Sequence, residues 1–109
     1  MIDLDLFKPW TDHLNFGQRQ WFAKSIEYIL LQGYELHETN EVTIWDGRPM
    51  TFKSGDCHIV VSRQIKTESM DLRPGIILEN EALSFETSIS VNTPLEVVFC
   101  AVKYLNNED

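Results

Sequence analysis

Basic residues, cysteines and long apolar runs are scarce in this chain, and each scarcity excludes a class of protein. Only 9 Lys and Arg residues stand against 17 Asp and Glu residues among 109, which gives a formal net charge of −8. A protein that reads nucleic acid needs a basic surface for its phosphate contacts, so direct nucleic-acid binding is not expected. An acidic surface instead keeps a protein soluble or attracts a basic protein partner.

The two cysteines, Cys57 and Cys100, are too few for the disulfide framework of a small secreted domain. We expect both to be reduced thiols in a cytoplasmic protein. The opening residues, Met1–Asp5, have neither the positive start nor the apolar stretch of a secretory signal. The longest apolar run, 97–102, is far shorter than the roughly 18 residues of a membrane span. We therefore expect neither secretion nor membrane association.

The composition is that of one folded domain covering residues 1–109. Hydrophobic residues make up 43% of the chain and aromatic residues 11%, which supplies a packed core and does not fit a disordered segment. A chain of this length buries roughly 65% of its unfolded surface, enough for one modest core. The sequence has no internal repeat, low-complexity tract or flexible linker, so we predict a single domain.

Two amphipathic helices are predicted, one toward each end of the chain. Asn15 and Gln18 form a capping box for a helix over 16–32, and Gly33 supplies a left-handed stop. A second helix has Thr93 as its cap and Pro94 at its first position, and most of its surface is expected to be buried. The expected core residues are Phe22, Ala23, Ile26, Ile29 and Leu30 in the first helix, and Leu95, Val98, Phe99, Val102 and Leu105 in the second.

The middle of the chain predicts antiparallel strands joined by tight turns. Hairpin signals occur at Asp46–Gly47 and Ser54–Asp56, whereas charges, a proline and a glycine predict a loop over 66–75. The turn at Asp46–Gly47 contains either two or three residues, and the two turn lengths place Trp45 on opposite faces of the sheet. The expected strands are 34–37, 42–45, 50–53, 57–63, 76–78 and 83–89. The expected core face of the second hairpin is Met50, Phe52, Cys57, Ile59 and Val61.

The fold class is therefore α+β. We expect an antiparallel sheet of about four to six strands with the two helices packed on one face, in the order α-β-β-β-β-β-α. The other face would meet solvent and be available to a partner. Residues 1–14 fit either an edge strand of this domain or a strand that pairs with another chain, and Trp10 is a candidate for docking on the core.

No spacing in the chain predicts catalysis, a cofactor or a metal site. The segment His37–Glu41 is a broken zinc-protease motif, because its last position holds a glutamate rather than the second histidine. Cys57 and His58 are neighbours on a predicted strand, so their side chains point to opposite faces and cannot share a proton. Cys100 lies on a polar helix stripe with no histidine within a turn to act as a base.

Two surfaces are candidates for binding a partner. The first is the flank of the first helix, where Trp21 and Tyr28 stack near Leu31, since aromatic residues are enriched at interfaces. The same rings would equally serve to cover the edge of the sheet. The second is the open face of the sheet with its loops, for which an ordinary solvated face is the alternative. Its candidate residues are His58, Asp71, Glu79, Glu81 and Glu86.

These observations favour a non-catalytic acidic protein-binding module. The simplest version is a small inhibitor or immunity-type protein, of the kind carried by phages and mobile elements, that blocks a basic protein which handles nucleic acid. A structural or assembly subunit that self-associates through its sheet edge or its aromatic helix flank is the alternative, and a homo-oligomer would follow from it. A third possibility is a small ligand-binding domain or enzyme whose site combines residues distant in the sequence.

Overall fold

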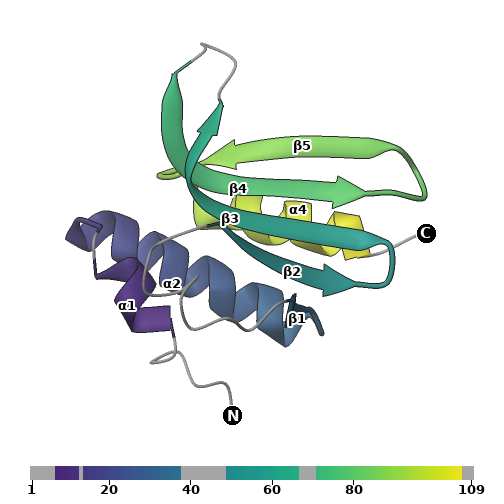
Figure 1. Cartoon of the computed structure of the whole chain (residues 1–109), viewed down its shortest axis with the longest axis horizontal. Helices are drawn as coiled ribbons and strands as arrows, with labels where there is room; N and C mark the ends of the chain where they lie inside the picture. Colours follow the sequence, from purple (N-terminus) through teal and green to yellow (C-terminus); the bar gives the residue numbers. More distant parts are fainter. Residues whose placement is uncertain (1–6, 13, 38–48, 67–70, 107–109) are drawn as a thin grey trace.

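The computed structural model describes residues 7–12, 14–37, 49–66 and 71–106 of the chain. They form helix, sheet and helix in the predicted order, and the α+β class is confirmed (Figure 1). The elements are α1 (Lys8–Thr11), α2 (Phe16–Leu31), β1 (Glu35–His37), β2 (Met50–Ser54), β3 (Cys57–Lys66), β4 (Leu72–Asn80), β5 (Phe85–Ser90) and α4 (Leu95–Asn106). The expected strand over 42–45, the face of Trp45 and residues 1–6 lie outside the described residues.

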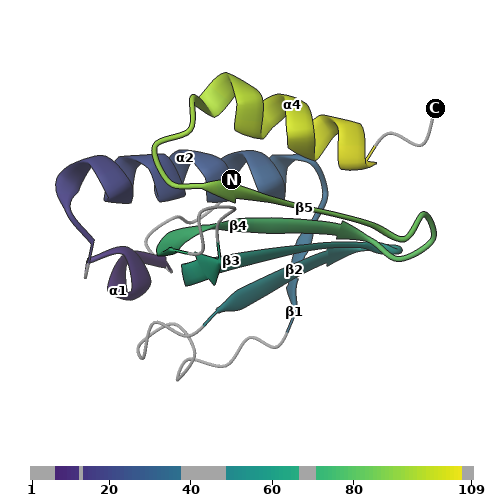
Figure 2. The same ribbon diagram turned by 90° about the horizontal axis from the view of Figure 1, so that it is seen from above.

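The five strands form one antiparallel sheet in which every strand pairs with its neighbours in the chain, in the order β1-β2-β3-β4-β5. Seen from above, α2 and α4 lie on the same side of this sheet (Figure 2). The opposite side, called the open face below, carries neither of the two long helices. Within the described residues, no helix is both long and apolar enough to cross a membrane.

Local sequence signals set both ends of α2. The N–H of Gln18 donates to the side chain of Asn15 at 2.8 Å, and the Gln18 side chain accepts from the Asn15 N–H at 3.4 Å. This is the predicted capping box, which pairs two of the backbone donors that a helix N-terminus leaves free. Gly33 follows the helix with φ +92°, a left-handed conformation that glycine adopts without the Cβ penalty.

The buried face of α2 is rotated from the predicted one. Trp21 and Ser25 are buried, whereas Ala23 and Leu30 are only half-buried, so the expected face was partly wrong. The reason is that α2 packs against α4 on one flank as well as against the sheet. The Ser25 hydroxyl is satisfied inside its own helix, where it donates to the Trp21 carbonyl at 2.8 Å.

The β2–β3 hairpin matches its prediction. Ser54 pairs with Cys57 across a two-residue turn, and Gly55 has φ +57° at the first turn position, as a type II′ turn requires. The period of two then turns alternate side chains inward. The five side chains expected on the core face are all buried: Met50, Phe52, Cys57, Ile59 and Val61.

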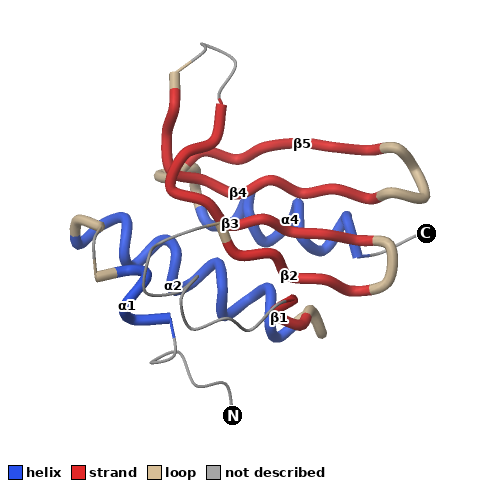
Figure 3. The backbone as a smooth tube through the Cα atoms, viewed as in Figure 1, coloured by secondary structure: helices blue, strands red, loops and turns tan. Residues whose placement is uncertain are grey.

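The predicted loop over 66–75 was wrong at both of its ends, and its middle, 67–70, lies outside the described residues. β3 continues to Lys66 and β4 begins at Leu72, so the ends of both strands extend beyond their neighbours (Figure 3). Pro74 led to the prediction, because proline cannot donate a hydrogen bond in a sheet. Proline is tolerated at a β-bulge, and this one lies opposite a break in the β3–β4 register.

The bulge places Arg63 and Gln64 of β3 opposite the single residue Pro74, between the pairs Ser62–Gly75 and Ile65–Arg73. The buried Ser62 hydroxyl holds it, since Ser62 Oγ donates to the Gln64 carbonyl and accepts from the Gln64 N–H, both at 3.2 Å. Pro74 still pairs on its other side, where its carbonyl accepts from the Val91 N–H at 2.8 Å.

The short helix α1 docks on the core through two aromatic rings. Trp10 is fully buried and meets the Phe22 ring edge-on, with centroids 5.0 Å apart, and Phe7 lies 6.0 Å from Phe52. The guanidinium of Arg63 lies 5.1 Å from the Trp10 ring centroid and donates to the Trp10 carbonyl at 2.6 Å. Burial lowers the pKa of Arg63 from its ordinary value. The expected docking of Trp10 is confirmed.

The second helix is less buried than predicted. Val98, Val102 and Leu105 lie in the core, but Val97 is 49% exposed and Tyr104 is 70% exposed. A helix in an outer layer buries only the side that faces the sheet and α2. Val97 and Tyr104, which are seven residues apart, lie on its outer side and meet solvent. The start of the helix also differs, since the Thr93 hydroxyl donates back to the Ser90 carbonyl at 2.7 Å and α4 begins at Leu95.

Candidate binding surface

The aromatic side chains predicted on the flank of α2 join the two helices. Trp21 is only 5% exposed, and its indole N–H donates to the Thr93 carbonyl at 2.7 Å. Tyr28 is half-buried and stacks on Phe99 of α4, with centroids 4.4 Å apart and planes inclined by 21°. Leu31 alone of the three candidates is well exposed, at 64%. The flank therefore offers no exposed pair of aromatic rings.

Four of the five residues predicted on the open face come together. His58 lies opposite Glu79, and Glu79 lies opposite Glu86 on the next strand. The ring Nδ1 of His58 is 3.5 Å from a carboxylate oxygen of Glu81. Glu79, Glu81 and Glu86 are called the acidic corner below. The full row across the sheet is Glu35, Lys53, His58, Glu79 and Glu86.

The acidic corner leaves its negative charge largely uncompensated. Glu79 and Glu86 stand directly opposite one another on neighbouring strands, an arrangement that destabilises a sheet when both side chains are charged. Within residues 49–66 and 71–106, neither forms an ion pair with a lysine or an arginine. The corner is therefore a place where an external cation would relieve repulsion.

Asp71, the fifth predicted residue, does not belong to this corner. It precedes β4 at the end remote from Glu79, and its carboxylate lies 3.6 Å from the guanidinium of Arg73. Both side chains are 59% exposed, and a solvated pair of this kind contributes little to stability.

A rigid turn carries the acidic corner. The Asn80 side-chain oxygen accepts from the Leu83 N–H at 3.3 Å, and the Ser84 N–H donates to the Glu81 carbonyl at 3.3 Å. The Glu81 N–H donates to the Asp56 carbonyl at 3.0 Å, which ties this turn to the β2–β3 turn. Leu83, expected in a strand, lies in the turn because these bonds close the chain between Asn80 and Phe85.

An apolar pocket of about 240 Å³ opens beside this turn. The rings of Phe85 and Tyr104 form its walls, with centroids 6.3 Å apart and planes inclined by 65°. A more polar hollow of about 340 Å³ adjoins it and shares Asn80 and Phe85 with it. The apolar pocket is lined by Asn80, Leu83, Phe85, Tyr104 and Leu105, and the polar hollow by Glu79, Asn80, Glu81, Ser84, Phe85 and Glu86.

Sequence reasoning missed the apolar pocket because it assigned these side chains to the core. The alternation of apolar and polar residues over 83–89 predicts a half-buried strand, and the helical spacing predicts that Tyr104 lies beside the buried face of its helix. One signal is present in the sequence: Leu83 lies two residues after Glu81, at the end of a polar turn segment, where an apolar side chain has no reason to be buried.

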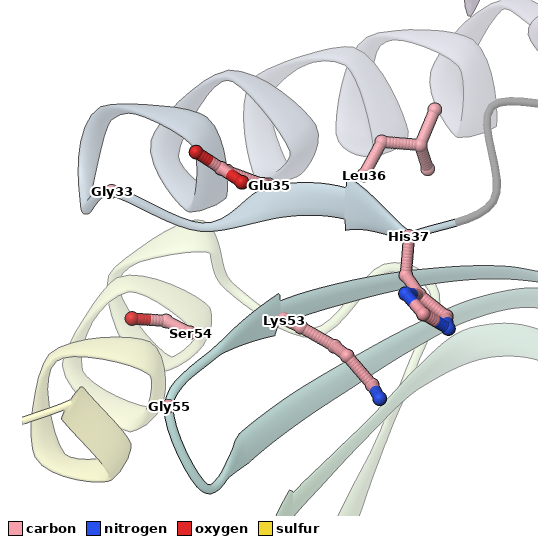
Figure 4. Close-up of a pocket in the computed structure, with 7 residues that line it drawn as sticks. All are labelled: Gly33, Glu35, Leu36, His37, Lys53, Ser54 and Gly55. Carbon is pink, nitrogen blue, oxygen red and sulfur yellow. The ribbon is translucent and has the colours of Figure 1, made fainter.

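A second polar pocket, of about 460 Å³, lies at the opposite edge of the sheet, between β1 and β2. Figure 4 shows the side chains of His37 and Lys53 extending toward the same side, while the carboxylate of Glu35 points away from the Lys53 ammonium. Leu36 is the one sizeable apolar residue in its lining. The pocket thus presents solvated charges of both signs and little surface that a ligand would bury.

A buried polar cluster lies under the apolar pocket. The Cys57 thiol donates to the Leu105 carbonyl at 3.2 Å and accepts from the Asn80 amide at 3.6 Å. The Tyr34 hydroxyl is also buried, beside Cys57, and makes no hydrogen bond of good geometry within the described residues. Burial first, and the neighbouring Cys57 second, raise the pKa of Tyr34 above its ordinary value. A thiol enclosed in this way fits a structural role rather than a nucleophilic one.

Replacing Tyr34 by phenylalanine should change the response of stability to alkali. Because the pKa of Tyr34 is raised in the folded state, the hydroxyl stays protonated there at a pH at which it ionises in the unfolded chain. Its contribution to the free energy of unfolding is therefore complete below the unfolded pKa of about 10 and is lost as the pH rises above 10. The slope amounts to about 1.4 kcal/mol per pH unit for one proton. We expect Tyr34→Phe to be near neutral at pH 7, because the hydroxyl is unpaired, and to reduce the loss of stability above pH 10.

Urea unfolding followed by circular dichroism between pH 7 and 11 measures this effect. Tyr104→Phe is the matched control, since that tyrosine is 70% exposed and should keep the wild-type slope. Equal slopes for wild type and Tyr34→Phe would contradict the prediction.

Within the described residues, no group of three or more His, Cys, Asp or Glu side chains is arranged to hold a metal ion. Cys57 and His58 lie on opposite faces of β3, as predicted, and share no proton. Comparison with protein-family models, with curated proteins and with solved structures finds no match to this chain.

Proposed function

We propose that this protein is a non-catalytic acidic binding module that blocks a basic protein which handles nucleic acid, in the manner of a small inhibitor or an immunity protein. The observation that supports it is the acidic corner, in which Glu79, Glu81 and Glu86 gather at one end of the open face with no lysine or arginine partner among the described residues. A partner that brings lysine or arginine side chains to this corner would remove the repulsion between Glu79 and Glu86.

The charge of the whole chain supports the same proposal. A net charge of −8 on 109 residues attracts a basic partner over several ångströms before contact, which raises the association rate and makes it sensitive to salt. The cytoplasm is part of the proposal, because the free Cys100 thiol is exposed and exposed thiols persist in a reducing compartment.

Charge reversal at the acidic corner tests the proposal. The triple variant Glu79→Lys/Glu81→Lys/Glu86→Lys should lose a basic protein that the wild-type chain captures from the native host's lysate at low salt. Release of that protein from the wild type should follow as salt rises, and with the purified partner the association rate of the variant should fall by about 10-fold to 100-fold. Mass spectrometry of the retained proteins and surface plasmon resonance make the two measurements.

The control is a second triple reversal at exposed acids outside the corner, Asp12→Lys/Asp71→Lys/Glu96→Lys, which changes the net charge equally. It should keep the partner with a smaller loss of rate. Two results would overturn the proposal: the corner variant retains the same protein as the wild type, or the wild type retains no basic protein at all.

Self-association through β5 is the second candidate function. β5 is the last strand of the sheet order, so one of its edges has no neighbouring strand among the described residues, and Figure 1 shows it along the outer margin of the sheet. Such an edge can pair with a second copy of the chain. Sedimentation over a range of protein concentrations separates the two functions, since a monomer at every concentration leaves only the first.

A further inference from the structure

Three large apolar or aromatic side chains around the apolar pocket are exposed to solvent. Leu83 is 69% exposed, Phe85 is 38% exposed and Tyr104 is 70% exposed, and all three line the same pocket. Single exposed apolar residues are ordinary on protein surfaces, but a cluster around a concave site marks a place of interaction.

The size of the pocket limits what it can hold. Its volume is about 240 Å³, below the range of roughly 300–1,000 Å³ that is typical of small-molecule sites. A cavity of this size suits one large apolar side chain of a protein partner. Leucine and phenylalanine are the natural occupants, because the walls are two aromatic rings and two leucines.

The pocket is built before a partner arrives. Asn80 holds Leu83 through the side-chain bond at 3.3 Å, and the bond from Glu81 to the Asp56 carbonyl anchors the turn to the neighbouring hairpin. Tyr104 projects from a helix whose next residue, Leu105, is only 3% exposed. A pre-formed site loses less conformational entropy when it binds.

The charges next to the pocket indicate which residues flank the side chain that it binds. The polar hollow that adjoins the pocket is lined by Glu79, Glu81 and Glu86 and shares Phe85 with it. A partner segment that continues from the pocket into this hollow would therefore come close to carboxylates that have no lysine or arginine partner among the described residues.

We propose that the apolar pocket seats one leucine or aromatic side chain of a basic segment in a partner protein, with neighbouring lysine or arginine residues of that segment contacting the acidic corner. This inference rests on the proposed function and deepens it by naming the recognition element of the partner. The apolar side chain supplies contact area, and the flanking cations orient it.

Three synthetic peptides test the inference against the intact isotope-labelled protein by ¹H–¹⁵N correlation spectroscopy. They are Lys-Lys-Phe-Lys-Lys, Lys-Lys-Ser-Lys-Lys and Glu-Glu-Phe-Glu-Glu, each with blocked ends. The first should shift the amide signals of Leu83, Phe85 and Leu105 together with those of the acidic corner. The second should shift the acidic corner alone, and the third should shift neither.

The outcomes separate this inference from the proposed function. If the phenylalanine and serine peptides give the same pattern, the pocket is not occupied and the inference fails, while the acidic corner still binds cations. If the acidic peptide binds as well as the basic ones, charge complementarity is absent and both proposals fail. If no peptide shifts a signal of the pocket, the inference is likewise overturned.

A pair of variants adds a second readout. Tyr104→Ala removes one wall of the pocket and should weaken the phenylalanine peptide about tenfold, while leaving the serine peptide unchanged. Phe16→Ala is the matched control, since Phe16 is a ring of nearly equal exposure (71%) on another helix. Equal affinities of the two variants for the phenylalanine peptide would overturn the assignment of the pocket.

Discussion

Gly75→Ala should destabilise the protein by roughly 3 kcal/mol, at the upper end of what overpacking costs in a folded core. A Cβ atom on Gly75 would lie 2.4 Å from the Cδ1 of Ile65 and 2.4 Å from the carbonyl oxygen of Ile89. The Ile65 side chain can rotate away, but the Ile89 oxygen belongs to the backbone of the paired strand β5. Relief therefore requires the two strands to separate locally.

The register of the sheet explains why this position is so crowded. Gly75 lies opposite Ser62 and Ser90, so its missing side chain would point to the open face. Ile65, displaced by the β-bulge, is 3% exposed and covers that point. A glycine is otherwise unfavourable inside a strand, and the close approach of Ile65 is the reason for this one.

Gly17→Ala is the matched control for this prediction. The same methyl group added there meets only the Asn15 side-chain oxygen at 3.7 Å, an ordinary contact. Alanine in the first turn of α2 should be neutral or stabilising. Urea unfolding measures both variants, and a loss below about 1 kcal/mol for Gly75→Ala would show that the strands accommodate a side chain there.

Trp10→Ala should cost about 3–5 kcal/mol, the range for deleting a large buried aromatic side chain. Trp10 is fully buried, meets the Phe22 ring at 5.0 Å and lies under the Arg63 guanidinium at 5.1 Å. Removing the indole leaves a cavity between α1, α2 and the bulge of β3, and it uncovers the partly buried cation. Since small domains are stable by only about 5–15 kcal/mol, the variant should unfold at a markedly lower urea concentration.

Phe16→Ala distinguishes this effect from a general response to the loss of an aromatic ring. Phe16 is 71% exposed at the start of α2, and its replacement should change stability by no more than about 0.5 kcal/mol. If Trp10→Ala cost as little as the control, residues 7–12 would not belong to the folded core. A large cost would show that the N-terminal segment is needed for stability.

Several features of the fold were predictable because they depend on neighbours in the sequence. The capping box of Asn15 and Gln18 satisfies backbone donors three residues apart, and the Gly55 turn needs a conformation that glycine favours. The core face of β2 and β3 followed from the period of two once that turn was located.

The candidate site was predictable only in its charged part. Carboxylates in turns are exposed in nearly any fold, so Glu79 and Glu81 were plausible surface residues before the structure was known. That His58 and Glu86 both lie beside Glu79 depends on the strand register, which the turn at residues 81–84 sets. The apolar pocket was missed because periodicity marks a side chain as apolar but does not tell whether another element covers it.

By itself, the sequence of this protein determined its acidic surface, the limits of its first helix, the β2–β3 hairpin and the α+β class, since these depend on composition and on hydrogen bonds between near neighbours. Only the tertiary structure decided the rest. Trp21 is buried because its indole reaches Thr93, 72 positions away, and residues 72–75 form a strand because the β3 bulge accommodates Pro74. Tyr104 meets Phe85 because α4 packs across the sheet. Contacts between distant segments depend on how whole elements pack together, and no local pattern records that packing.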